Sequence, residues 1–357
     1  MAAHASANDP NNSPSASEEP LSRRRFLEGG SLFASAAALG LVSGGCAGSG
    51  GPAASPPEAA RGDGSEDLGT IPRRVLGRTG VPVSILGLGT ACMGEGPQNA
   101  EECAAVFSEA IDRGINYVDT ARIYGDAETA LGSVLKTRRD KVFLVTKCMT
   151  NSAADAQKSF EESLRQLQVD HVDVLHLHAT GDRDIDQALG PGGAWEYIAR
   201  MKKDGKARFV GITGHSMPEK FLRVLATDQV DVVMVAMNFV DRYTYGFEEK
   251  VRPEALRRKA GVMAMKVYGG IRGGFAFNRQ RRPSQMDPIH HHIAVRYSLN
   301  LPGVTGVVLG VHDAEELRQN IRFVLNAPPL SPSEVAALEA TGKRIAQEWG
   351  PRFGPVV

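Results

Sequence analysis

The six residues Val142-Phe143-Leu144-Val145-Thr146-Lys147 form a short run that is apolar at most positions and ends in a charge. Such runs are typical of strands that are buried on both faces of a parallel sheet. Seven more short runs rich in Val and Ile occur along the chain from about Ile71 onward. We expect strands at Ser84–Leu88, Asn116–Asp119, Val142–Lys147, Val172–Leu177, Ala207–Thr213, Val230–Met237, Gly261–Val267 and Gly306–Gly310.

Longer amphipathic stretches separate these runs, with apolar residues returning at three and four positions, as in a helix. They include Ala100–Arg113, Ala154–Gln168, Trp195–Lys203 and Glu315–Leu325. Eight such strand-helix units over about 280 residues match the size of a TIM barrel.

A doubly wound open sheet is the alternative fold, and it normally carries GxGxxG after its first strand. The stretch Gly87-Leu88-Gly89-Thr90-Ala91-Cys92 lacks the third glycine. The sequence therefore predicts an α/β protein with a (β/α)8 TIM barrel over residues 71–350 and a C-terminal tail over 351–357.

Composition excludes some classes of partner. The chain has 357 residues, of which 41 are basic and 41 acidic, so no net charge attracts it to nucleic acid or an anionic membrane. Its four cysteines have no metal-ligand spacing. His290-His291-His292 does not indicate a metal site either, because consecutive helical residues point in different directions. We expect no nucleic-acid partner and no metal.

The N-terminal residues differ in character from the rest. Ser22-Arg23-Arg24-Arg25-Phe26-Leu27 precedes an uncharged run from Gly29 to Gly45, which gives a basic region followed by a weakly apolar one. This arrangement resembles a twin-arginine (Tat) signal. A membrane-anchoring helix and chance arginines in a disordered tail are the alternatives. We expect a Tat-type signal over residues 1–46, recognised by the Tat export machinery, and a protein that is periplasmic or attached to the outer face of the membrane.

Cys46 ends this signal region in Val42-Ser43-Gly44-Gly45-Cys46, which loosely resembles a lipoprotein cleavage box. Cys46 is therefore either a lipid anchor or a cysteine near an ordinary cleavage site. Residues 47–70 are rich in Gly, Ser, Pro and Ala, and such a composition buries too little surface to fold. They are predicted to form a disordered linker.

Four polar residues lie at the C-terminal ends of neighbouring predicted strands or in the loop that follows one of them. They are Asp119, Tyr124, Lys147 and His178. The catalytic groups of TIM barrels occupy this end of the strands. Each residue alone has a structural explanation, but a charge after an apolar run such as Val142–Val145 needs a partner.

Together these residues suit proton donation to a carbonyl oxygen. A free phenol has a pKa of about 10, and an adjacent ammonium lowers it by stabilising the phenolate. We expect Lys147 to supply that charge to Tyr124, with Asp119 holding the ammonium. His178 would bind the carbonyl oxygen and orient it toward the phenol.

Several stretches resemble the aldo/keto reductase family. They are Arg74–Gly80, Tyr117–Gly125 with Glu128 and Leu131-Gly132 after it, Asp173–His178, and Gly310–Asn320. The resemblance runs from about Arg73 to Phe323 and implies a barrel, a nicotinamide cofactor and the tetrad Asp119, Tyr124, Lys147 and His178.

Cofactor-binding positions carry over less completely. The family's Ser-Asn pair after the fifth strand is Thr213-Gly214 here, so the hydroxyl remains and the amide does not. Where the family usually has a glutamine, four residues before Asn238, this chain has Met234, whereas Asn238 itself remains. Tyr268 either stacks on nicotinamide or packs against the barrel. The resemblance implies cofactor contacts at Thr213, Asn238, Lys266, Gly269, Gly270, Gly310, Gln319 and Asn320.

The resemblance implies NADP(H) rather than NAD(H), but local chemistry opposes it. Asp313 and Glu316 lie where relatives often present basic or polar groups to the 2′-phosphate, and carboxylates there would repel it. Asp313 is alternatively a helix cap that faces solvent. The arginines of the segment 272–282 form either a solvated loop or a flap over the cofactor. We favour NADP(H) over NAD(H).

The sequence thus predicts an NAD(P)H-dependent oxidoreductase that reduces an aldehyde or ketone, or oxidises the alcohol. The alternative is a regulatory or redox-sensing barrel that binds cofactor with little turnover. A barrel glycosidase would need two facing carboxylates, for which only Asp119 and Glu128 are near. Substrate contacts are expected from the loops Gly181–Gly193 and Asp241–Glu249.

Overall fold

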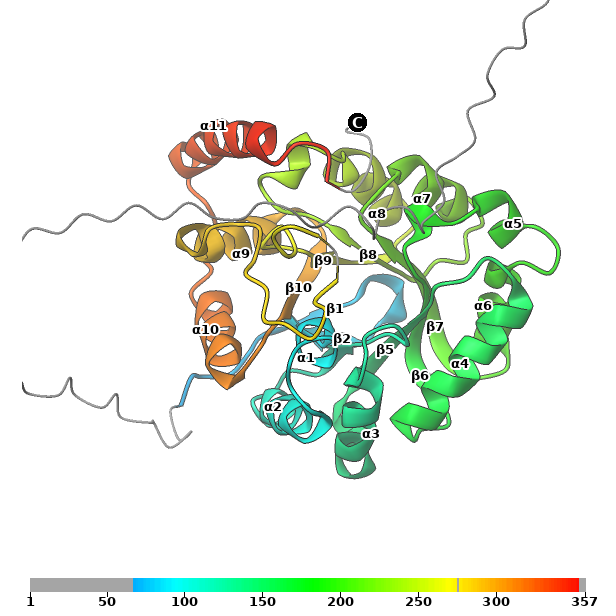
Figure 1. Ribbon diagram of the computed structural model, residues 1–357. Helices are drawn as coiled ribbons and strands as arrows, with labels where there is room; N and C mark the ends of the chain where they lie inside the picture. The colour runs from blue at the N-terminus through cyan, green and yellow to red at the C-terminus, as the bar shows by residue number, and fades with distance from the viewer. Residues whose placement is uncertain (1–66, 275, 353–357) are drawn as a thin grey trace, which may run out of the picture. The chain divides into compact units, whose positions relative to one another are not determined.

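Eight parallel strands close into a barrel, with helices around its outside (Figure 1). The structure, a computed structural model, describes residues 67–274 and 276–352. The chain divides into two units at residue 62, and the barrel belongs to the second. In order around the barrel the strands are β10 (Val304–Gly310), β3 (Leu86–Gly89), β4 (Tyr117–Asp119), β5 (Phe143–Cys148), β6 (Val172–Leu177), β7 (Ala207–Gly214), β8 (Val232–Ala236) and β9 (Gly261–Met265).

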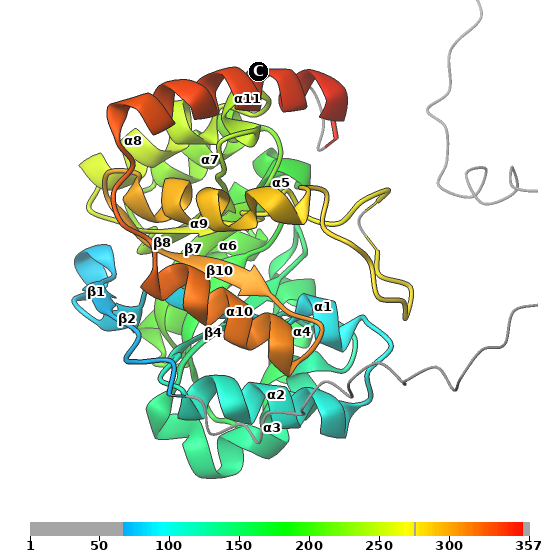
Figure 2. The same ribbon diagram turned by 90° about the vertical axis from the view of Figure 1, so that its left-hand side faces the viewer.

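The predicted (β/α)8 barrel is confirmed, and the open-sheet alternative is wrong. Helices follow the strands in the expected alternation, and the turned view in Figure 2 shows several of them along one flank. They are α1 (Ala91–Gly94), α2 (Ala100–Asp112), α3 (Ala127–Arg138), α4 (Ala153–Leu167), α5 (Ile185–Leu189), α6 (Ala194–Lys203), α7 (Pro218–Leu225), α8 (Arg252–Arg257), α9 (His291–Asn300), α10 (Ala314–Leu325) and α11 (Pro332–Trp349).

Side-chain caps fix where several helices begin. The Asn99 side chain accepts from the backbone N–H groups of Glu101 and Glu102 in α2, and the Glu102 side chain accepts from the Asn99 N–H. The Ser152 side chain accepts from the Asp155 N–H at the start of α4, and the Asp313 side chain accepts from the Glu316 N–H at the start of α10. Such caps satisfy N–H groups that have no partner within the helix. Each cap therefore sets the point at which the chain leaves a strand-helix loop.

One predicted strand, Ser84–Leu88, is divided in two. Ser84 ends β2 (Pro82–Ser84), which pairs antiparallel with β1 (Arg73–Val75), and the barrel strand β3 begins at Leu86. The Ile85 N–H donates to Pro72 O at 3.0 Å, so the chain changes partners there. Leu76 and Val83 of this hairpin region pack with Phe143, Val174 and other side chains of the barrel interior.

The interior is apolar near this hairpin and polar at the other end. Phe143 begins β5 beside Tyr117 of β4, whereas Lys147 and Asp119 lie near the C-terminal ends of the same strands. Because parallel strands bring their C-terminal ends to one edge, the polar groups gather there.

The N-terminal predictions lie largely outside the described residues. These are the Tat-type signal over 1–46, the anchor role of Cys46, and the linker up to residue 66. Residues 67–70 have neither helix nor strand, and Ile71 is buried, close to the expected start of the barrel. In the stretches 67–274 and 276–352, no helix has the length and apolar character needed to cross a membrane.

Candidate active site

A buried ion pair lies at the C-terminal ends of β4 and β5. Lys147 Nζ donates to Asp119 Oδ2 at 2.7 Å and to Thr120 O at 2.7 Å. The Lys147 side chain is 0% exposed and that of Asp119 5%. Burial raises the pKa of Asp119 and lowers that of Lys147, while each partner opposes the shift of the other. The pair is thus a buried charge held by its counter-charge, as expected.

Tyr124 and His178 complete the cluster. Lys147 Nζ lies over the Tyr124 ring, 4.6 Å from its centroid. The rings of Tyr124 and His178 are perpendicular with centroids 5.8 Å apart. The His178 N–H donates to Cys148 O at 2.8 Å, which ties the ends of β5 and β6 together. The structure therefore brings all four predicted catalytic residues to one place.

Burial keeps the two rings neutral. Burial raises the pKa of Tyr124 well above its ordinary range, and the nearby Asp119 carboxylate raises it further. Burial also lowers the pKa of His178 well below its ordinary range, and the Lys147 ammonium adds to this. At neutral pH the phenol is therefore protonated and the imidazole uncharged. A protonated phenol and a neutral imidazole suit a proton donor and a hydrogen-bonding partner for an oxygen atom.

The expectation that Lys147 lowers the phenol pKa is not met in this structure. The ammonium lies over the face of the Tyr124 ring, and Asp119 offsets its charge at 2.7 Å. Desolvation of the phenolate therefore has the larger effect.

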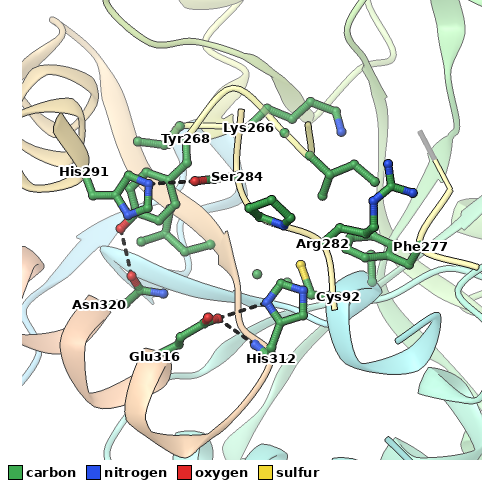
Figure 3. Close-up of a pocket in the computed structure, with 18 of the residues that line it drawn as sticks. Cys92, Lys266, Tyr268, Phe277, Arg282, Ser284, His291, His312, Glu316 and Asn320 are labelled. Carbon is green, nitrogen blue, oxygen red and sulfur yellow. Dashed lines mark hydrogen bonds and ion pairs between the residues drawn. The ribbon is translucent and has the colours of Figure 1, made fainter. Parts of the chain in front are cut away.

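A cavity of about 760 Å³ opens beside this cluster and reaches α10 (Figure 3). Its volume is within the usual range for ligand sites, roughly 300 to 1,000 Å³. Asp119 and Tyr124 line it. Of the predicted cofactor contacts, the lining includes Lys266, Gly270, Gly310, Gln319 and Asn320.

The other three predicted cofactor contacts are not among the lining residues. Thr213 is buried in β7 and donates to Met265 Sδ at 3.8 Å. Asn238 uses its whole amide internally: Nδ2 donates to Asp241 Oδ2 and Lys266 O, and Oδ1 accepts from the Val240 and Asp241 N–H groups. Gly269 donates its N–H to Lys266 O. In this structure Thr213, Asn238 and Gly269 thus make contacts within the protein and do not line the cavity.

Tyr268 packs within the cavity wall. Its ring stacks on His291 with centroids 3.9 Å apart, and its hydroxyl donates to Asn320 Oδ1 at 2.8 Å (Figure 3). Tyr268 also lines the cavity, so its stacking on nicotinamide and its packing against the barrel both stay predictions.

Arg281 neutralises the acidic start of α10. Its guanidinium pairs with Asp313 Oδ2 at 2.6 Å and Glu316 Oε1 at 2.5 Å. Although partial burial opposes the change, the Glu316 N–H and then Arg281 lower the pKa of Asp313. Asp313 is thus the predicted helix cap and also an ion-pair partner. The sequence showed an arginine-rich loop but not which arginine reaches these carboxylates.

Two further contacts hold the loop between β9 and α9, and the sequence analysis missed both. Arg279 pairs with Asp126 at 2.8 Å, so this end of the loop reaches the start of α3. Arg352 donates to Gly269 O at 2.7 Å and Ile271 O at 3.1 Å. Arg279 thus ties the loop to the start of α3, and the predicted C-terminal tail begins in contact with the loop.

The three consecutive histidines have separate partners. His290 lies against Phe239, His291 stacks on Tyr268, and His292 contacts Asn326 O at 2.6 Å. In the part of the chain that the structure describes, no group of three His, Cys, Asp or Glu residues is placed to hold a metal ion.

Glu128 is engaged within the protein and is not free to act in a glycosidase pair. Its two oxygens accept from Arg122 Nη1 at 2.6 Å and Thr146 Oγ1 at 2.7 Å, and the residue is 1% exposed. A carboxylate with both oxygens bonded within the protein is not available to protonate a glycosidic oxygen.

Comparison with known proteins agrees with this geometry. Residues 85–293 match the Aldo/keto reductase family. L-galactose dehydrogenase of Arabidopsis thaliana is 37% identical over 318 residues, which cover 78% of this chain and 98% of that protein. Pyridoxal 4-dehydrogenase of Microbacterium luteolum is 25% identical over 317 residues, covering 70% of this chain and 92% of that protein.

Solved structures share the fold. An aldo-keto reductase of Bacillus halodurans in its apo form is 26% identical, with a TM-score of 0.59, covering 76% of this chain and 95% of that one. An aldo/keto reductase of Klebsiella pneumoniae in complex with NADP and acetate is 24% identical, with a TM-score of 0.62, covering 80% of this chain and 100% of that one.

Proposed function

Because the chain belongs to the aldo/keto reductase family and is an NAD(P)-dependent oxidoreductase of carbonyls and alcohols, we propose that Tyr124 is its proton donor and acceptor. The observation that carries this proposal is the buried Lys147–Asp119 pair beneath the Tyr124 ring, beside His178.

In the reducing direction the protein's own groups deliver one proton to the substrate oxygen. A bound nicotinamide supplies the hydride. The neutral His178 imidazole hydrogen-bonds the substrate oxygen, and the Tyr124 hydroxyl gives it a proton. As the phenolate forms, the Lys147 ammonium stabilises it, while Asp119 keeps that ammonium in place. Oxidation of the alcohol uses the same groups in reverse.

The test is Tyr124→Phe, which we expect to lower kcat by at least about a hundredfold with little change in the Kd for cofactor. Tyr197→Phe is a matched control, because it removes a buried phenol hydroxyl from the outer helix α6. Retained turnover in Tyr124→Phe would contradict the assignment. A wild type that binds cofactor but turns over none of a broad carbonyl panel would favour the regulatory alternative.

We propose NADP(H) as the cofactor. The cavity fits a dinucleotide phosphate in size, and Arg272, Arg281 and Arg282 line it. The carboxylates that argued against a 2′-phosphate are compensated by Arg281. Titrating NADPH and NADH by tryptophan fluorescence tests this. At least tenfold tighter binding of NADPH is expected, and equal affinities would contradict the proposal.

We propose a polyhydroxylated aldehyde or its alcohol as the substrate class. The support is the 37% identical relative named L-galactose dehydrogenase. Steady-state rates with L-galactose, other aldoses, pyridoxal and simple ketones test the class. A preference for simple ketones would overturn it.

We propose export through the Tat pathway, to the periplasm or the outer face of the membrane, on the basis of the sequence around Arg23 and Arg24. A cofactor-loaded barrel has to fold where the cofactor is made, and Tat carries folded proteins. Replacing both arginines with lysine should retain the protein in the cytoplasm. A wild type found only in the cytoplasm by fractionation would contradict export.

A further inference from the structure

One buried carboxylate joins the two chain segments that carry Tyr124 and Lys147. Glu128 lies in the first turn of α3 and is 1% exposed. It accepts from Thr146 Oγ1 at 2.7 Å, and Thr146 directly precedes Lys147 on β5. Its other oxygen accepts from Arg122 Nη1 at 2.6 Å, and Arg122 lies two residues before Tyr124.

The network continues to α4, which fixes Arg122 from the other side. Arg122 Nη1 also donates to Gln166 Oε1, and Gln166 Nε2 donates to Glu162 Oε1 at 2.7 Å. A Cβ on Gly132 would lie 2.2 Å from Gln166 O, so α3 and α4 approach this closely only because residue 132 has no side chain. The bonds of Arg122 and Gln166 thus link the Glu128 carboxylate to α4.

We propose that Glu128 is a positioning residue, which holds the Tyr124 loop against β5 so that the Lys147 ammonium stays beside the phenol whose phenolate form it stabilises. This inference rests on the proposed roles of Tyr124 and Lys147. Positioning matters because a misplacement of about 1 Å can cost a hundredfold in rate.

Glu128 also acts on the charge of Lys147. Two carboxylates favour the ammonium against its burial: Asp119 by direct contact, and Glu128 through space from beyond Thr146. The other groups facing Lys147 carry no charge at neutral pH. They are the Tyr124 phenol, the His178 ring and the His176 ring. Burial and then the Lys147 charge lower the pKa of His176 to about 3. Removing Glu128 should therefore lower the pKa of Lys147.

Three substitutions separate position from charge. Thr146→Val removes one hydrogen bond and keeps the Glu128–Arg122 pair, so we expect kcat to fall about tenfold with an unchanged pH profile. Thr146→Ser should restore most of the rate, because its hydroxyl can make the same bond. Glu128→Gln should lower kcat further and move the basic limb of the kcat profile to lower pH by about half a unit or more. The Kd for NADPH should change little in all three.

Asp173→Asn is the matched control. Asp173 is a buried carboxylate that accepts from the Leu144 N–H at the opposite end of β5 and pairs with Arg139 and Arg208. It should lower the thermal midpoint and leave the pH profile of kcat unchanged. If Glu128→Gln does not fold, the Thr146 pair decides the question.

Wild-type kcat in Thr146→Val would overturn the positioning role, as would an equal loss in Thr146→Val and Thr146→Ser. The proposed function fails separately, if Tyr124→Phe stays active.

Discussion

Replacing Lys147 with methionine should make the stability of the protein depend on pH in a new way. The side chains of Lys147 and Asp119 are almost fully buried, and the structure gives Asp119 Oδ2 this one ionic partner. Methionine keeps most of the volume but leaves a buried carboxylate uncompensated. Breaking such a pair usually costs about 3–5 kcal/mol.

The same magnitude follows from the proton that Asp119 would take up. The unpaired carboxyl can remain buried by staying neutral, which raises its folded pKa above the unfolded value of about 3.9. Between those two values the folded state binds the extra proton, so the free energy of unfolding falls by about 1.4 kcal/mol per pH unit. Over the roughly three units up to pH 7, the loss reaches about 4 kcal/mol.

Urea unfolding followed by tryptophan fluorescence between pH 4 and pH 8 measures this directly. The free energy of unfolding of Lys147→Met should fall by about 4 kcal/mol between pH 4 and pH 7, whereas the wild type should lose less, because Lys147 opposes the rise in the pKa of Asp119. The double variant Lys147→Met with Asp119→Asn removes the titrating group, so it should recover most of the stability at pH 7. A pH-independent deficit, or a double variant less stable than the single one, would refute the reasoning.

Three other predictions concern separate parts of the site. Arg281→Ala should reduce the preference for NADPH over NADH about fivefold at low salt, because two α10 carboxylates lose their partner; an unchanged ratio of Kd values would argue against this. Gly211→Ala should destabilise the barrel by about 1–3 kcal/mol, because the new Cβ would lie 2.3 Å from the backbone oxygen of Val232 and 2.5 Å from the His176 ring; an unchanged thermal midpoint would show that β7 and β8 can relax around the methyl group. His178 should remain neutral, so its NMR signals should show no titration between pH 5 and pH 8, and a midpoint near 6.5 would contradict its described burial.

The strands that could be predicted from sequence are those buried on both faces. Val172–Leu177 is observed with its predicted bounds, because each of its residues is buried and the run is flanked by polar residues. The β1–β2 hairpin was missed since Arg73–Val75 is exposed throughout and has no apolar pattern. Its partner Ser84 was joined to the next strand because nothing in the local composition marks the change of direction at Ile85.

The catalytic cluster followed from chain order alone. Parallel strands deliver their C-terminal residues to one edge, so Asp119, Lys147 and His178 had to meet once the barrel was recognised. Contacts set by loop conformation could not be predicted in this way. The sequence does not reveal that Arg281 reaches α10, or that the Asn238 amide donates hydrogen bonds to Asp241 and Lys266 O.

The contacts of Arg352 affect how the protein can be produced for these experiments. Its guanidinium binds two carbonyls of the loop that lines the cofactor cavity, and its N–H donates to Tyr245 Oη at 2.7 Å. An affinity tag or fusion partner joined directly after this residue would pull on that loop and disturb the affinity being measured. A flexible spacer should therefore separate any tag from Arg352, and the cleaved and uncleaved proteins should be compared before any Kd is assigned.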